Sequence, residues 1–268
     1  MDKNLHAIAL ILLLILASCR NDGVKIQGSL PIDSLTEVKL VNIMTGKELL
    51  VDTVVPSDFS LNAQHVQQGI YLLEFSWNRH QLKPQEIKER SQFQTQVTPK
   101  HVLSKAIWLD HKSKQQIKLG TSDNLSQEDL EIHLLNENGE FGLIAESDRE
   151  NAQLFEKFLQ IGTGYSKLNR ESKEKIKAKQ YAANDSGDFE QSKVLQKQLE
   201  QSWDPVVKAT MLHAEVDFLK KQLHRPFVPY ILYARIGSKD DFKIYQSIYE
   251  GLDEDVKEKI GVWFEKYM

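Results

Sequence analysis

Alternation of apolar and polar residues dominates the chain from residue 24 to about 135, and turn-forming residues separate the alternating stretches. Val38 and Leu40, for example, alternate with polar neighbours, as expected of a strand with one buried face. Strands are expected at 38–40, 49–55, 59–61, 70–75, 106–109 and 116–119. Several short strands at this spacing predict an antiparallel β-sandwich or a small barrel.

One segment interrupts this pattern. Residues 77–105 contain Pro84, Pro99 and scattered glutamines, with few apolar positions. This composition predicts a loop inserted between two strands, and loops of such length are commonly either functional or disordered. The sequence favours neither alternative.

Helical periodicity replaces the alternation from about residue 150. Leu154, Phe158 and Ile161 share one helix face, and residues 165–183 continue as a charged, largely solvated helix. The segment Gly162-Thr163-Gly164 lacks the preceding strand and third glycine of a dinucleotide-binding turn, so a helix break is expected there. Residues 184–188 form a dense turn signal.

A second apolar stripe after this turn predicts a helix that returns antiparallel to the first, as a helical hairpin. Pro205 should kink this helix or start a new one. Two shorter helices, at 240–249 and 253–267, follow the break at Pro226 and Pro229. The stripe consists of Leu195, Leu199, Trp203, Val207, Met211, Ala214 and Phe218. The aromatic residues of the two short helices are expected to pack rather than to bind a ligand; they are Phe242, Tyr245, Tyr249, Trp263 and Phe264. The predicted fold class is α+β.

The N-terminus predicts a lipid anchor. Lys3 precedes an uninterrupted apolar stretch at 7–16, too short to span a bilayer, and Leu16-Ala17-Ser18-Cys19 resembles the bacterial lipoprotein signal box. Cys19 is therefore the expected attachment site for palmitate-type acyl chains, which hold a protein durably to a membrane. The alternative is an ordinary cleaved signal with an incidental thiol. The expected organisation is a signal peptide at 1–18, a β-rich domain at 19–145 and a helical domain at 146–268.

Composition and charge exclude several classes of function. A formal net charge of −4 gives no electrostatic reason to expect nucleic acid as a partner. Cys19 is the only cysteine, so an acylated chain has no thiol left for disulfides, catalysis or metal binding.

No catalytic, cofactor-binding or metal-binding residues are predicted. Glycine-rich phosphate loops, nucleophile elbows and zinc-peptidase motifs are absent from the sequence. His213 and Asp217 would share a helix face with Glu215 pointing elsewhere, and a metal there would need a third ligand from another segment. His101 and His111 flank an expected strand and are predicted to be solvated.

Several motifs resemble a known family. They are Ile26-Gln27-Gly28, Val51-Asp52-Thr53, Asp58-Phe59-Ser60-Leu61, Gln68-Gly69-Ile70-Tyr71-Leu72 and, after a hairpin at 151–223, Arg225-Pro226-Phe227-Val228-Pro229-Tyr230. Together they are similar to the β-rich N-terminal domain and helical hairpin of bacterial thiol–disulfide interchange lipoproteins of the TlpA/ResA type. The sequence departs from that family in its longer insertion at 77–105 and in having no thioredoxin-like domain with Cys-x-x-Cys. The redox activity of those proteins is therefore not implied.

Two functions remain open. The first is a non-catalytic binding or scaffold module of the cell envelope, with a protein, peptide or glycan partner. The second is an accessory subunit of a thiol–disulfide or cytochrome-maturation pathway without its own redox centre, which the family resemblance alone implies.

Arg20 directly after Cys19 favours attachment to the outer membrane, with the protein facing the periplasm or the exterior. Asp33-Ser34-Leu35 and Asp52-Thr53-Val54 resemble a short bacterial O-glycosylation sequence.

Overall fold

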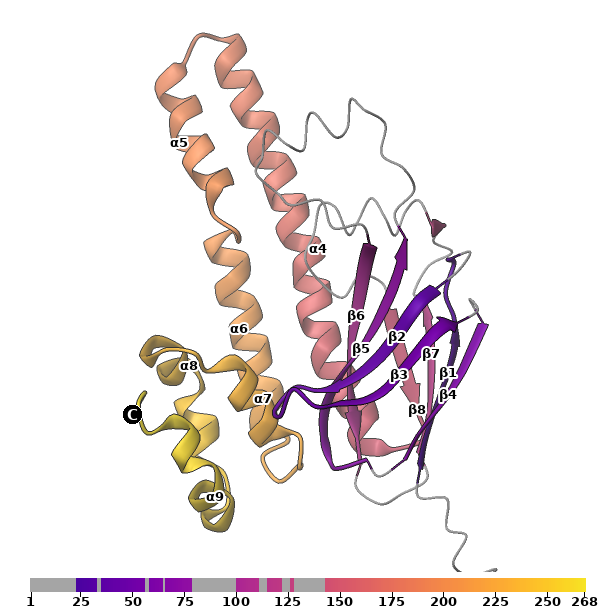
Figure 1. The fold of residues 1–268 in the computed structure, drawn as a ribbon. Helices are drawn as coiled ribbons and strands as arrows, with labels where there is room; N and C mark the ends of the chain where they lie inside the picture. Colours follow the sequence, from indigo (N-terminus) through magenta and orange to yellow (C-terminus); the bar gives the residue numbers. More distant parts are fainter. Residues whose placement is uncertain are drawn as a thin grey trace, which may run out of the picture.

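The computed structural model describes residues 23–32, 35–55, 58–64, 66–78, 100–110, 115–121, 126–127 and 143–268, and for residues 50–55 it describes the backbone only. The predicted α+β fold is confirmed, with strands first and helices after them (Figure 1). The strands are β1 (Gly23–Ser29), β2 (Leu35–Asn42), β3 (Glu48–Val55), β4 (Asp58–Gln64), β5 (Gly69–Asn78), β6 (Lys100–Leu109), β7 (Gln115–Thr121) and β8 (Leu143–Ser147). The helices are α4 (Glu150–Asp185), α5 (Phe189–Glu200), α6 (Pro205–Lys220), α7 (Val228–Arg235), α8 (Lys239–Glu250) and α9 (Glu254–Phe264).

The strands form two four-stranded sheets, in the orders β4-β1-β7-β8 and β3-β2-β5-β6. Neighbouring strands are antiparallel except β1 and β7, which are parallel. The sheets share one apolar core, in which the rings of Phe59 on β4 and Phe75 on β5 lie 5.3 Å apart. The arrangement is therefore a sandwich.

The alternation in the sequence explains this core. Val24 and Ile26 on β1, and Val38 and Leu40 on β2, are fully buried, while the residues between them are more exposed. Side chains in a strand point alternately to opposite faces, so each sheet buries one face against the other.

Gly28 allows β1 and β7 to approach closely. It lies opposite Leu119 in the parallel pairing, and a Cβ atom at this position would be 2.5 Å from the Leu119 carbonyl oxygen. Only glycine fits this contact without movement of the backbone.

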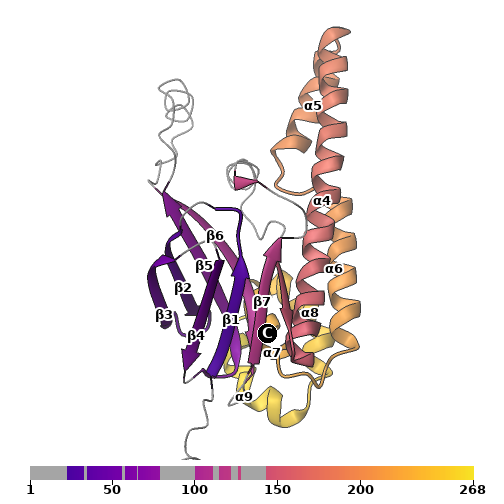
Figure 2. The same ribbon diagram turned by 90° about the vertical axis from the view of Figure 1, so that its right-hand side faces the viewer.

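Helix α4 covers one side of the sandwich. It contacts both β6 and β8, which are the edge strands of the two sheets (Figures 1 and 2). The described strands therefore do not close into the barrel that the sequence left possible, because a helix lies along the two edges instead. An edge covered in this way cannot pair with a strand of another molecule.

The predicted helical hairpin is observed. Helix α4 has 36 residues, a length of about 54 Å at 1.5 Å per residue, and α5 and α6 return along it. Strands of seven to ten residues span only about 23–34 Å, so the far end of the hairpin stands clear of the sheets (Figure 2).

The helix break predicted at residues 162–164 is wrong. Helix α4 continues through Gly162, Thr163 and Gly164 without interruption. Each glycine costs only about 1 kcal/mol in a helix interior, and the packing of Phe155 and Phe158 before them outweighs that cost.

Pro205 starts a new helix, one of the two outcomes expected for it. It is the first residue of α6, and Asp204 before it caps that helix. Along the predicted stripe, Leu195 is buried and the other members are partly buried. Helix α7, which Pro229 helps to begin, was not predicted.

The remaining helices form a second core against the outer face of β5 and β6. Trp108 of β6 packs against Phe155, Phe227 and Tyr230. The aromatic residues of α8 and α9 also lie in this core, which confirms their packing role.

The strands reach further into the segment expected to be an inserted loop than the sequence suggested. Trp77 belongs to β5, and residues 100–105 belong to β6. Residues 79–99 lie outside the described residues.

Candidate functional site

The most prominent feature of the described residues is the α4–α5 hairpin, and a buried ion pair fixes its base. The Lys105 ammonium of β6 lies 2.9 Å from one Glu156 carboxylate oxygen of α4 and donates a hydrogen bond to the other at 3.0 Å. Both side chains are buried. Breaking a buried pair is strongly destabilising, so this contact holds α4 in register with the sheet edge.

Several polar contacts join the two arms of the hairpin, in addition to the buried side chains of Ala183 and Leu195. The Asn169 side-chain oxygen accepts the backbone N–H of Asp204 at 2.7 Å, and the Ser172 hydroxyl donates to the Asp204 carboxylate at 2.7 Å. Further out, the Gln180 amide donates to the Gln196 side-chain oxygen at 2.7 Å. We call residues 165–200 with these contacts the shaft.

Asp204 is the central group at the junction of α5 and α6. Its carboxylate also accepts the backbone N–H groups of Val206 and Val207, which caps α6. The hydrogen bond from Ser172 holds the pKa of Asp204 below its usual range, and the two backbone N–H groups act in the same direction.

Large apolar side chains on the shaft face solvent. Leu168 and Tyr181 of α4 are 48% and 56% exposed, and Phe189 and Val194 of α5 are 64% and 51% exposed. The hairpin therefore buries Ala183 and Leu195 but leaves several large apolar groups facing solvent. In a self-sufficient helical pair most such groups would lie in the stripe that faces the partner helix.

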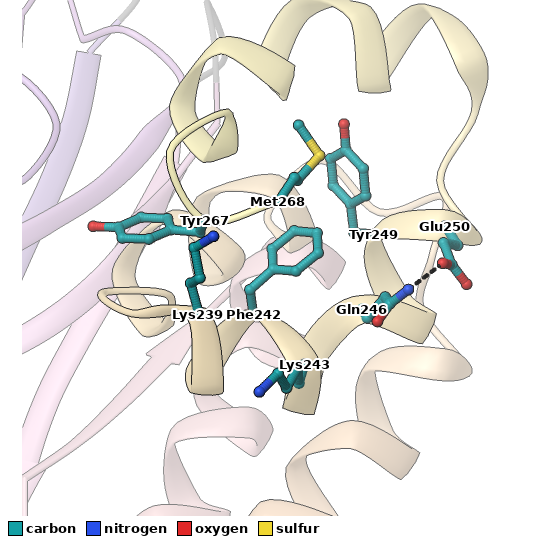
Figure 3. A pocket seen from close by; sticks show the side chains of 8 residues that line it. All are labelled: Lys239, Phe242, Lys243, Gln246, Tyr249, Glu250, Tyr267 and Met268. Atoms are coloured by element: carbon teal, nitrogen blue, oxygen red, sulfur yellow. Dashed lines mark hydrogen bonds between the residues drawn. The ribbon is translucent and has the colours of Figure 1, made fainter.

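A second candidate is a hollow of about 390 Å³ beside α8, within the size range of ligand pockets (Figure 3). Phe242, Tyr249 and Met268 give it an apolar lining. Its other lining residues are Lys239, Lys243, Gln246, Glu250 and Tyr267. The Gln246 amide donates to Glu250 at 2.7 Å, and Lys243 pairs with Asp240 at 2.9 Å, so much of its polar lining is already engaged.

A buried carboxylate on α6 positions α8. Glu215 is fully buried, and it accepts hydrogen bonds from the Tyr245 hydroxyl at 2.6 Å and from the Arg235 guanidinium at 2.7 Å. Burial, followed by the charge of Glu215, raises the pKa of Tyr245 far above its usual range. Tyr245 is therefore a neutral donor at physiological pH. Since both carboxylate oxygens are engaged, this group ties α6, α7 and α8 together.

The predicted relation among His213, Glu215 and Asp217 is correct. The His213 ring nitrogen lies 3.3 Å from the Asp217 carboxylate on an exposed helix face, and Glu215 points inward. Within the described part of the chain, no group of three or more His, Cys, Asp or Glu side chains is placed to hold a metal ion.

The prediction of a solvated His101 is wrong. His101 is buried on β6 opposite Trp77 of β5, and the two rings lie 5.3 Å apart. The sequence placed this histidine outside the strand, whereas β6 begins one residue before it. Cys19 and His111 lie outside the described residues.

The burial of Lys105, Glu156 and Glu215 was not predicted from the sequence. One weak pattern in the sequence points to the burial of Lys105. This lysine lies two positions from Leu103 and two from Ile107, so in a strand it would share their apolar face. Its partner lies 51 positions away along the chain, which no local pattern can reveal.

Comparisons of this chain with protein-family models, curated proteins and solved structures gave no match. Across the described ranges, no helix combines the length and apolar character needed to cross a membrane.

Proposed function

We propose that this protein is a lipid-anchored, non-catalytic binding module of the bacterial cell envelope, and that the shaft contacts its partner. The observation that carries this proposal is the projection of the hairpin beyond the sheets (Figures 1 and 2). The projecting part bears the exposed apolar side chains of Leu168, Tyr181, Phe189 and Val194. The shaft carries four of the ten large apolar side chains that are exposed among the described residues, and a concentration of such groups is typical of interaction surfaces.

The topology supports this role by separating the shaft from the proposed anchor. Val24 pairs with Gln115 and Ile117 pairs with Ser147, so the start of β1 and the end of β8 lie at the same end of the sheet. Helix α4 begins three residues after Ser147 and runs toward the opposite end. The turn at 186–188 is therefore at the far end from Gly23.

The sequence supports the anchor itself. Cys19 precedes Gly23 by four residues, which reach at most about 14 Å when fully extended. A lipid on Cys19 would therefore hold the Gly23 end near an outer-membrane surface and direct the tip of the hairpin away from it.

The anchor is tested by metabolic labelling with an alkyne analogue of palmitate, followed by membrane fractionation. We expect the native chain to be labelled and to sediment with membranes, and Cys19→Ala to lose both properties. A Cys19→Ala chain that is still labelled would refute the lipid assignment.

The contact role of the shaft is tested by photocrosslinking in cells. A benzophenone amino acid replaces Leu168 or Tyr181, and the matched control places it at Val102, which is 50% exposed on β6 of the sandwich. We expect a discrete adduct from the two shaft positions and none from Val102. Adducts from Val102 alone would reject the shaft as the contact surface.

A further inference from the structure

One segment of the shaft, on α4, has a charge opposite to that of the whole chain. Residues 167–179 contain six basic and two acidic side chains, an excess of +4, whereas the chain has a formal net charge of −4. The basic residues are Lys167, Arg170, Lys173, Lys175, Lys177 and Lys179, and four of these lysines, 167, 175, 177 and 179, are exposed. A local excess of this size attracts partners of opposite charge and speeds their encounter.

Apolar groups lie among these charges. Leu168 falls within the basic segment, and Tyr181 follows it with the Lys177 ammonium 5.8 Å from the centre of its ring. A partner that covers the shaft would therefore need both acidic and apolar groups. A hydrated polyanion offers the first but not the second.

The tip of the hairpin has the opposite charge from the basic segment 167–179. Residues 185–190 contain Asp185, Asp188 and Glu190 and no basic residue. An anionic lipid surface would repel this tip when approached end-on. The charges thus favour a partner that lies along the side of the shaft.

From this charge and apolar pattern, and resting on the proposed function, we infer that the shaft binds an acidic protein surface that presents apolar side chains, away from the anchoring membrane. Exposed charges at the edge of an interface, such as these lysines, set the association rate and the salt dependence of binding. Leu168 lies on the same face of α4 as Lys175 and Lys179, which are 7 and 11 positions further along the helix. An apolar contact with Leu168 would supply the part of the affinity that salt does not screen.

The test measures binding of defined probes to the full-length protein in neutral detergent. The probes are a synthetic amphipathic helical peptide of repeating glutamate and leucine, phosphatidylglycerol vesicles and polyglutamate. We expect the amphipathic peptide to bind most tightly, with a dissociation constant that rises with salt. Tighter binding of the vesicles or of polyglutamate would overturn the inference, as would a lack of binding to the peptide.

Matched charge variants locate the binding surface. Lys175→Glu with Lys179→Glu removes the excess charge of residues 167–179 and should weaken peptide binding about tenfold at low salt. Lys118→Glu with Lys259→Glu makes the same charge change on exposed residues of β7 and α9 and should change peptide binding less than about twofold. Equal effects of the two pairs would overturn the inference.

The two proposals fail in distinguishable ways. Adducts from Leu168 and Tyr181 in cells, together with no effect of the shaft charge variants, would keep the shaft as the contact surface and reject an acidic partner. An absence of adducts from either position would reject the contact role itself.

Discussion

A double-mutant cycle on Glu215 and Tyr245 tests whether the buried carboxylate contributes to stability through its partners. The Tyr245 hydroxyl lies 2.6 Å from a carboxylate oxygen, a distance typical of a charge-assisted bond. Glu215 is 0% and Tyr245 2% exposed, so neither group can turn to water if its partner is removed.

The expected magnitudes follow from this burial. Tyr245→Phe leaves a buried carboxylate oxygen without its donor, at a cost of about 2 kcal/mol in the free energy of unfolding. Glu215→Leu leaves the buried hydroxyl without an acceptor, again at about 2 kcal/mol. Arg235 is 40% exposed and can be solvated in that variant.

The double variant removes both polar groups, so neither penalty remains in full. The double variant should lose about as much free energy of unfolding as one single variant. The sum of the two single losses then exceeds the loss of the double variant by about 2 kcal/mol, which is the coupling energy. Urea denaturation followed by far-ultraviolet circular dichroism measures all four proteins. Losses that add to within about 0.5 kcal/mol would show that the two groups do not interact, and would refute the reasoning.

Gly28→Ala should lower the free energy of unfolding by about 3 kcal/mol in urea denaturation, because the new Cβ would lie 2.5 Å from the Leu119 carbonyl oxygen; an unchanged urea midpoint would contradict the close approach. Gly164→Ala should raise that midpoint, gaining about 0.5–1 kcal/mol, because no atom within 4 Å opposes a methyl group and alanine favours the helix; a loss would indicate an unrecognised contact. Asp204→Ala should cost about 1 kcal/mol of helix-cap stability, while Asp204→Asn keeps the cap and should cost less; equal losses would argue against capping. Because the folded-state pKa of Tyr245 is raised, its contribution is fully present below pH 10 and is lost as the pH rises further, by about 1.4 kcal/mol per pH unit; alkaline urea titration should show this slope, and Tyr245→Phe should reduce it.

The sandwich could be predicted because burial of one sheet face leaves a two-residue period in the sequence. Val38 and Leu40 show that period and lie in the core. The pairing of β1 with β7 could not be read in the same way, because a parallel pair joins segments that are distant along the chain.

The errors arose where packing outweighed local preference. Gly162 and Gly164 predicted a break, but the packing of Phe155 and Phe158 outweighs the cost of the two glycines and α4 continues through them. His101 and Lys105 were expected in solvent or in a loop, yet both are buried on β6. Polar residues indicate exposure only on average, and a specific partner across the fold overrides that tendency.

The place of α4 along the edges of both sheets determines how force on the hairpin would be carried. A helix attached by a flexible linker would swing freely, but α4 cannot tilt without separating Lys105 from Glu156 and uncovering β6 and β8. A force applied at the end of the hairpin would therefore be transmitted to the β-sandwich through the base of α4, because no flexible linker separates the two.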